Sequence, residues 1–157
     1  MVITQIIDED FVNYKVPSMY IGFPKCDFKC EKECGLRVCQ NNMLVKSPQL
    51  EIDDVKIIDR YMNNPITEAI VIAGLEPFDT YDQLSTFIKR FREKCDDDIV
   101  IYTGYYESEI KEQLEELKKY KNIIVKFGRY IPNKKSHFDS ILGVDLASDN
   151  QYAMRIS

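Results

Sequence analysis

Histidine, positive charge and long apolar runs are scarce in this chain, and each scarcity excludes a class of function. His137 is the one histidine among 157 residues, so His-based catalytic triads and His-rich metal sites are hard to build. Asp and Glu outnumber Lys and Arg by 26 to 21, and the net charge of -5 argues against a nucleic-acid binder, which usually carries a basic face. No stretch approaches the roughly 20 apolar residues of a membrane span.

Length and composition indicate one globular domain. A chain of 157 residues, 45% hydrophobic and 30% charged, can bury an ordinary core without disulfide staples. Its first ten residues lack the basic start and the small-residue cleavage site of a secretory signal peptide. We therefore expect a single domain over residues 1–157, located in the cytoplasm, where thiols stay reduced.

Cysteine is the residue type that the chain concentrates in one place. Four of the five cysteines lie within fourteen residues, directly after the apolar run at 20–23: Cys26, Cys30, Cys34 and Cys39. Clustered thiols in a chain without an export signal favour metal binding over disulfides. We therefore expect these cysteines to hold a metal.

The spacing of the cysteines leaves several kinds of site open. A structural zinc site would use all four thiolates, but the gaps of three, three and four residues are not the usual arrangement of two pairs. An iron–sulfur cluster could use three thiolates and leave one iron open for a substrate or cofactor. A redox dithiol would need a two-residue gap, which is absent, and free surface cysteines would need no ligand. The spacing favours a cluster over zinc.

Short apolar runs and amphipathic stretches alternate along the chain. The runs at 19–23, 69–73, 99–102 and 123–127 predict strands. Three helices are predicted between them, with apolar faces formed by Val55, Ile58 and Met62, by Leu84, Phe87, Ile88 and Phe91, and by Ile110, Leu114 and Leu117. Asp53 is a candidate N-cap of the first helix, and Thr80 with Gln83 forms a capping-box pattern before the second.

This alternation predicts an α/β fold with a mostly parallel sheet and right-handed crossovers. A closed eight-stranded barrel needs about 250 residues, so this chain can form only an open, partial (β/α) barrel. Ligands of such sheets bind beyond the carboxyl ends of the strands. The cysteine loop, Gly74–Pro77 and Thr103–Tyr105 each follow a predicted strand, so we expect them to converge on one edge of the sheet.

A series of short motifs, in order along nearly the whole chain, resembles radical S-adenosyl-L-methionine (SAM) proteins. More narrowly, it resembles the anaerobic ribonucleotide reductase activating protein family, the small activases of glycyl-radical enzymes. The motifs are Cys26-Asp27-Phe28-Lys29-Cys30, Cys39-Gln40-Asn41, Gly74-Leu75-Glu76-Pro77, Tyr102-Thr103-Gly104-Tyr105, Phe127-Gly128-Arg129-Tyr130 and Ala147-Ser148-Asp149-Asn150-Gln151.

The cysteine motif of that family is C-x3-C-x2-C, whereas position 33 of this chain is Glu. The first two ligands correspond to Cys26 and Cys30. The third is Cys34, the nearest in spacing, or Cys39, which has the family's following polar residue and Asn. We prefer Cys39, with residues 31–38 as an insertion and Cys34 as the alternative. Where that family has the motif Gly-Gly-Glu-Pro, this chain has Leu75 in place of the second Gly.

The resemblance implies a partial barrel of the radical SAM type in which three thiolates hold a [4Fe-4S] cluster. It implies that SAM binds at the open iron, along Gly74, Leu75, Glu76, Pro77, Tyr102 and Thr103. Glu76 would either fix the turn or bind an amine of the cofactor. The implied activity is that of an oxidoreductase: reductive cleavage of SAM yields a 5'-deoxyadenosyl radical, which abstracts hydrogen from a glycine of a partner enzyme. No general base is needed.

The implied partner is a glycyl-radical enzyme, in the first place an anaerobic ribonucleotide reductase, with an electron donor such as flavodoxin or ferredoxin. The alternative function is a non-catalytic iron–sulfur or zinc binding module that serves as a partner subunit. A protein partner is also favoured by the segment from Gly128 onward, whose roughly thirty residues offer little material for a lid over a small metabolite. The basic residues Lys126, Arg129, Lys134 and Lys135 are expected on a solvated face that could dock an acidic partner.

Overall fold

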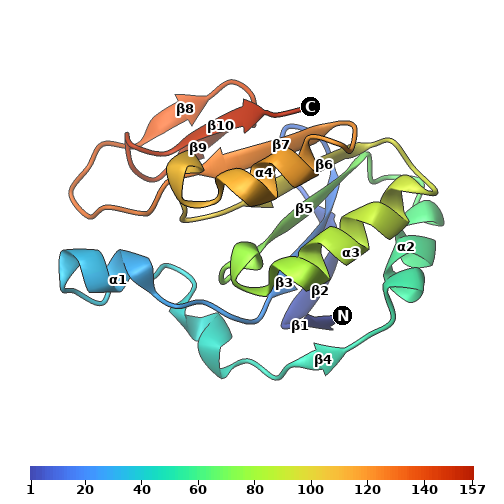
Figure 1. Cartoon of the computed structure of the whole chain (residues 1–157), viewed down its shortest axis with the longest axis horizontal. Helices are drawn as coiled ribbons and strands as arrows, with labels where there is room; N and C mark the ends of the chain where they lie inside the picture. Colours follow the sequence, from blue (N-terminus) through green and yellow to red (C-terminus); the bar gives the residue numbers. More distant parts are fainter.

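The computed structural model describes all residues, 1–157, as a mixed α/β structure around a central, mostly parallel sheet (Figure 1). The middle of the sheet consists of four parallel strands: β3 (Ser18–Phe23), β5 (Ala69–Gly74), β6 (Asp98–Tyr102) and β7 (Ile123–Phe127). Antiparallel strands β2 (Gln5–Asp10) and β10 (Tyr152–Arg155) form the two edges, so the order is β10-β7-β6-β5-β3-β2. These edge strands do not pair with each other, and the sheet is therefore open.

The four predicted strands are confirmed, each to within one residue at either end. Every residue of β3, β5 and β7 is buried, which is typical of parallel strands covered on both faces. The edge strands were not predicted as strands. β10 has a half-exposed, partly polar sequence, and β2 is rich in acidic residues, so neither gives the signal of an apolar run.

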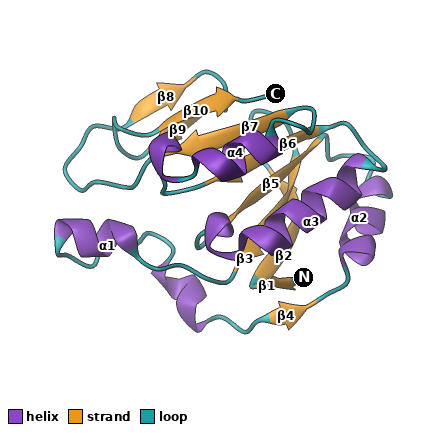
Figure 2. Cartoon of the chain, viewed as in Figure 1, coloured by secondary structure: helices purple, strands orange, loops and turns teal.

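Three helices cover one face of the sheet (Figure 2): α2 (Asp54–Met62), α3 (Tyr81–Arg92) and α4 (Lys111–Leu117). Together with the strands they enclose a core of 22 buried residues. The predicted apolar face of α3 is confirmed, because all four of its named residues are buried, and the same holds for the three named residues around α4. This core, between the helices and the sheet, supplies most of the apolar burial of the fold.

Two details of the helix predictions are wrong. In α2 Ile58 is buried as predicted, but Val55 and Met62 are about half exposed. The buried apolar face consists of Ile57, Ile58 and Tyr61, and the prediction left out Ile57 and Tyr61. Its N-cap is nevertheless Asp53, as predicted, whose carboxylate accepts a hydrogen bond from the Val55 amide at 3.0 Å.

The capping box predicted before α3 does not form either. A 3-10 turn, η2 (Pro77–Thr80), leads into the helix, and the Thr80 side chain makes no capping hydrogen bond. The Gln83 side chain instead bonds both backbone groups of Val2, at 2.7 and 2.8 Å. Gln83 thus fastens β1 (Val2–Ile3) to α3.

The opposite face of the sheet is covered by loops and by a hairpin. A second core of ten buried residues includes Tyr14 from the β2–β3 connection and Leu142 and Leu146 from the C-terminal segment. In that segment β8 (His137–Asp139) pairs with β9 (Val144–Leu146) beside β10. The residues after Gly128, which were expected to offer little material for a lid, therefore cover part of this face of the sheet.

The cysteine loop is an arm between β3 and the short strand β4 (Leu50–Glu51), which pairs with β1. It contains α1 (Lys29–Cys34) and the 3-10 turn η1 (Asn42–Lys46), and neither has a buried residue. Figure 1 shows α1 set apart from the helix layer, below the chain that follows β7. The arm therefore contributes little to the apolar core.

None of the helices has the length and apolar character needed to cross a membrane.

Candidate metal and cofactor site

A cavity of about 500 Å³ opens at the carboxyl ends of the parallel strands. Cys26, Cys30 and Cys39 line it. The loop after β5 contributes Gly74, Leu75 and Glu76, and the end of β6 contributes Tyr102 and Thr103. The three segments predicted to converge do so, because parallel strands bring their carboxyl ends to one edge.

The three cysteines that line the cavity are half-buried. The Cys26 sulfur accepts a hydrogen bond from the Phe28 amide at 3.2 Å, and burial raises the pKa of the Cys26 thiol to about 12. Burial also raises the pKa of Cys30 and of Cys39. Cysteine binds a metal as the thiolate, so a metal that binds here would displace the protons of these thiols. Its positive charge would then stabilise the thiolates.

Cys34 occupies a different place from the other three. It does not line the cavity, and its sulfur lies 3.8 Å from the Glu31 carbonyl oxygen and 3.5 Å from that of Leu36. Cys39, by contrast, is held toward the cavity through its amide, which donates to the Glu31 carboxylate at 3.1 Å. The residues present therefore suit a three-thiolate site formed by Cys26, Cys30 and Cys39.

The turn after β5 explains why one glycine is needed and the next is not. Gly74 has φ +90, and a Cβ there would lie 2.6 Å from the Phe23 amide nitrogen. Leu75 has no positive φ, and its amide donates to the Phe23 carbonyl at 3.0 Å. The Asn41 side chain donates to the Gly74 carbonyl at 2.6 Å, so it ties the end of the cysteine loop to this turn.

Glu76 braces two loops against each other. Its buried carboxylate accepts hydrogen bonds from the Phe78 amide at 3.1 Å, the Thr103 hydroxyl at 2.8 Å and the Gly104 amide at 2.8 Å. Burial raises the pKa of Glu76 to about 7, although these donors oppose the shift. Of the two roles expected for Glu76, the geometry shows the turn-fixing one. Pro77 does not line the cavity and is buried at the first position of η2.

The prediction of a solvated basic face is wrong for two of its four residues, Lys126 and Arg129. Lys126 and Arg129 are 7% and 3% exposed and both line the cavity. Burial lowers the pKa of Lys126 to about 8. Lys134 and Lys135 are exposed, as expected.

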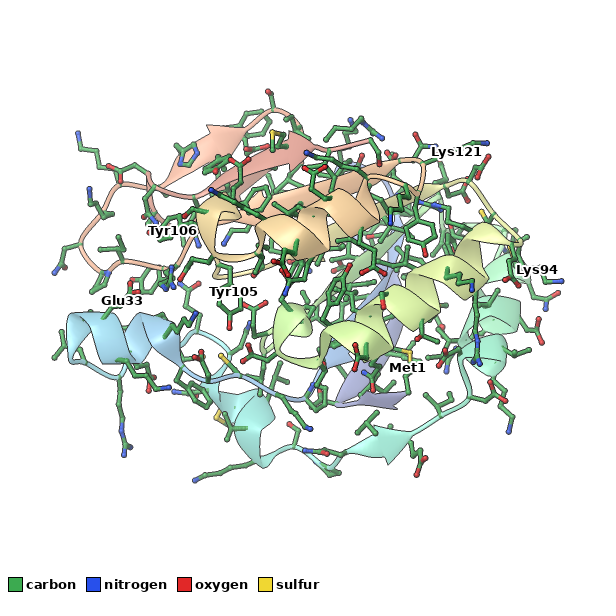
Figure 3. All side chains as sticks on the ribbon, viewed as in Figure 1. Met1, Glu33, Lys94, Tyr105, Tyr106 and Lys121 are labelled. Carbon is green, nitrogen blue, oxygen red and sulfur yellow. The ribbon has the colours of Figure 1, made fainter.

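Arg129 links the cavity to the cysteine arm. Its guanidinium donates to both carboxylate oxygens of Glu109, in η3 (Glu107–Glu109), at 2.8 and 2.5 Å. Its Nε lies 3.2 Å from the carboxylate of Glu33 on α1. Figure 3 shows Glu33 facing the segment that carries Tyr105 and Tyr106. Arg129 therefore makes a charged contact between α1 and the chain that follows β7.

Lys126 is the most informative cavity residue that the sequence interpretation placed wrongly. It interrupts the otherwise apolar run Ile123–Phe127, and a charge inside a buried strand is a signal that such a residue has a role. Asp10, which also lines the cavity, comes from a segment without a comparable signal, whereas Gln151, another lining residue, ends the motif at 147–151 that the sequence analysis named.

A family model described as a 4Fe-4S single cluster domain matches residues 18–151. The chain belongs to this family. The match begins at β3 and includes the whole cysteine cluster, so it indicates a [4Fe-4S] cluster-binding domain and favours the iron–sulfur over the zinc interpretation. No curated protein and no solved structure matches the chain.

Proposed function

We propose that this iron–sulfur protein is a radical SAM activase and that its open sheet is a partial barrel of the radical SAM type. The observation that carries the proposal is a single cavity. Cys26, Cys30 and Cys39 line it together with the Gly74–Glu76 turn, at the carboxyl ends of parallel strands. Three thiolates would leave one iron of the cluster without a protein ligand, on the side where the cavity offers room for a small molecule.

The residues of the chain have distinct roles in this proposal. Cys26, Cys30 and Cys39 would hold the cluster, while Gly74 and Leu75 would present backbone to the cofactor. Tyr102 and Thr103 border the same space. When bound, the cluster and SAM together supply one-electron cleavage of the sulfonium and a carbon radical that abstracts hydrogen; the protein contributes orientation and exclusion of water.

The proposed partner is a glycyl-radical enzyme, most simply an anaerobic ribonucleotide reductase, and the proposed electron donor is a flavodoxin or ferredoxin. Support for a protein partner comes from two exposed apolar side chains, one at the cavity and one on the cysteine arm. Val12, which lines the cavity, is 72% exposed, and Met43 of the cysteine arm is 79% exposed. Contact with a partner protein would remove these two side chains from water.

The test is turnover of SAM by the anaerobically reconstituted protein. Iron and sulfide contents first establish the [4Fe-4S] cluster. SAM and a reductant are then added, and 5'-deoxyadenosine is measured with and without the reductase from the same cell. The activase proposal expects 5'-deoxyadenosine, and a glycyl doublet on the reductase in electron paramagnetic resonance spectra.

Two results would redirect the assignment. A fully loaded cluster that yields no 5'-deoxyadenosine favours the non-catalytic iron–sulfur module. Formation of 5'-deoxyadenosine driven by free small molecules at substrate-like rates, with no radical on the reductase, would replace the protein partner with a metabolite.

A further inference from the structure

Cys26 lines a second opening besides the cavity at the carboxyl ends of the strands. This opening is a groove of about 430 Å³ between the cysteine arm and the turn after β5. It is lined by residues 24–28 at the start of the arm, by Val45 of η1, and by Leu75 and Asp79. Leu75, like Cys26, lines both the groove and the cavity. Cys26 is therefore accessible from a side that does not pass through the cavity.

The proposed function gives such a second approach a use. The cavity would hold the cofactor and receive the glycine of the partner enzyme, so an electron donor that docks elsewhere competes with neither. A third opening is lined by Cys26 and Cys30, but it is about 30 Å³, room for little more than a water molecule. The groove is the larger of these two approaches to a ligand thiolate.

The arm that borders the groove is positively charged, although the chain as a whole is acidic. Residues 24–46 contain five lysine or arginine side chains and three carboxylates, whereas the whole chain has a net charge of -5. Lys29 and Lys32 are engaged in ion pairs within the protein. Lys25, which lines the groove, and Lys46, which follows Val45, are exposed and form no ion pair.

The two carboxylates that line the groove have partners within the protein. Asp79 accepts hydrogen bonds from the Asp27 amide at 2.7 Å and from the Tyr105 hydroxyl at 2.5 Å. Asp27 accepts from the Lys29 amide at 3.1 Å and pairs with Lys32 at 3.7 Å. The unpaired charges at the groove are therefore positive, and they favour an acidic partner.

We propose that this groove, with Lys25 and Lys46, is the docking surface for an acidic one-electron carrier protein. The inference rests on the proposed function and names the surface that its electron donor uses. The carrier loses one electron and the cluster held by Cys26 gains it, while any proton that the carrier's cofactor releases goes to water. Docking beside a ligand thiolate brings the carrier close to the cluster and leaves the cavity free.

The experiment measures electron transfer between the cluster and a flavodoxin, without SAM. Wild-type protein and the double variant Lys25→Glu, Lys46→Glu are loaded to equal iron and sulfide contents, reduced, freed of excess reductant and mixed anaerobically with oxidised flavodoxin. Transfer in this direction uses the same docked complex, and the absorbance of the flavin gives its second-order rate constant. At low salt the double variant should react about 10-fold more slowly, because two attractive charges become repulsive. Added salt should slow the wild-type reaction and not that of the variant.

Three controls separate docking from other effects. Riboflavin, a free and uncharged flavin, should oxidise the cluster at the same rate in wild type and double variant. The variant Lys56→Glu, Lys94→Glu makes the same change of net charge on α2 and after α3, at the end of the molecule away from α1 (Figures 1 and 3), and should change the rate constant less than about 2-fold. The neutral pair Lys25→Gln, Lys46→Gln replaces the charge reversal if that variant fails to load the cluster, and should slow the reaction about 3-fold.

The outcomes are distinct. Slower transfer to flavodoxin alone supports the docking surface. An unchanged rate constant, or an equal loss with riboflavin or in the Lys56 and Lys94 variant, overturns it. Loss of the glycyl doublet when a chemical reductant supplies the electron would assign the groove to the glycyl-radical enzyme and also overturn it. The proposed function fails on a different result, the absence of 5'-deoxyadenosine from SAM and a chemical reductant.

Discussion

The cysteine arm and the parallel sheet are held by different forces. The sheet strands β3, β5 and β7 are buried throughout, and Phe23 and Ile72 are fully inaccessible. The arm buries no residue of α1 or η1. It is held by hydrogen bonds, among them those from Asn41 to the Gly74 carbonyl and from the Asp27 amide to Asp79, and by the ion pair of Glu33 with Arg129. The sheet thus has an apolar core of its own to stabilise it, whereas the arm depends on its contacts with the sheet and on what the cysteines bind.

The first prediction, with the largest effect, removes a ligand from the arm. Cys39→Ser should abolish the [4Fe-4S] cluster, because a three-thiolate site has no spare ligand, while the apo protein should remain folded because the core contains none of the clustered cysteines. Iron and sulfide contents and the electron paramagnetic resonance spectrum of the reduced protein measure the loss.

Cys34→Ser is the matched control. It lies outside the cavity, so it should keep the full iron and sulfide content of the wild type. A Cys34→Ser protein without a cluster, beside a loaded Cys39→Ser protein, would make Cys34 the third ligand and overturn the assignment.

The second prediction compares apolar side chains of the two regions. Ile72→Ala, at a fully buried position of β5, should lower the free energy of unfolding by about 2–5 kcal/mol, the cost of a large-to-small change in a packed core. Met43→Ala, in the arm, should change it by less than about 0.5 kcal/mol because the side chain is 79% exposed. Urea unfolding of the apo proteins measures both; equal losses would show that the arm is part of the cooperative core.

The parallel part of the fold could be predicted from the sequence because its signal is local. Each buried strand is a short apolar run, and the α3 face recurs at helical spacing from Leu84 to Phe91. The edge strand β10 could not be predicted in this way. Its pairing with β7 joins Tyr152 to Phe127 across long sequence separation, and its own sequence is partly polar.

The site shows the same division between local and distant information. The cysteines and the Gly74 turn were found because each is a compact motif that follows a strand. The burial of Arg129 was missed because it depends on Glu109 and Glu33, which come from two other segments. The same holds for Lys126, because the cavity that it lines is also lined by Leu146 and Gln151, which are distant in sequence.

The third prediction tests the turn that joins the sheet to the site. Gly74→Ala should destabilise the protein by about 1–3 kcal/mol, because φ +90 is strained for alanine and its Cβ would meet the Phe23 backbone. Gly104→Ala, whose Cβ would lie 3.6 Å from the nearest atom at an unstrained φ, should be tolerated. Thermal unfolding compares the pair, and equal stability of the two variants would contradict the requirement for glycine at position 74.

The last prediction, with the smallest expected effect, removes a contact between the arm and the sheet and leaves every cysteine in place. Arg129→Met should leave Glu33 without its partner, so amides of α1 should exchange hydrogen about 5-fold faster, a loss of about 1 kcal/mol in local stability. The estimate is modest because Glu33 is 58% exposed and water replaces part of the lost interaction. Amides of β5 should exchange at the wild-type rate.

Lys121→Met, which removes an exposed ion pair with Asp96 at the far end of the sheet (Figure 3), is the control and should leave hydrogen exchange in α1 unchanged. Unaltered exchange of α1 in Arg129→Met would mean that hydrogen bonds hold the arm without this ion pair, whereas faster exchange in α1 and β5 together would mean that Arg129 supports the whole fold.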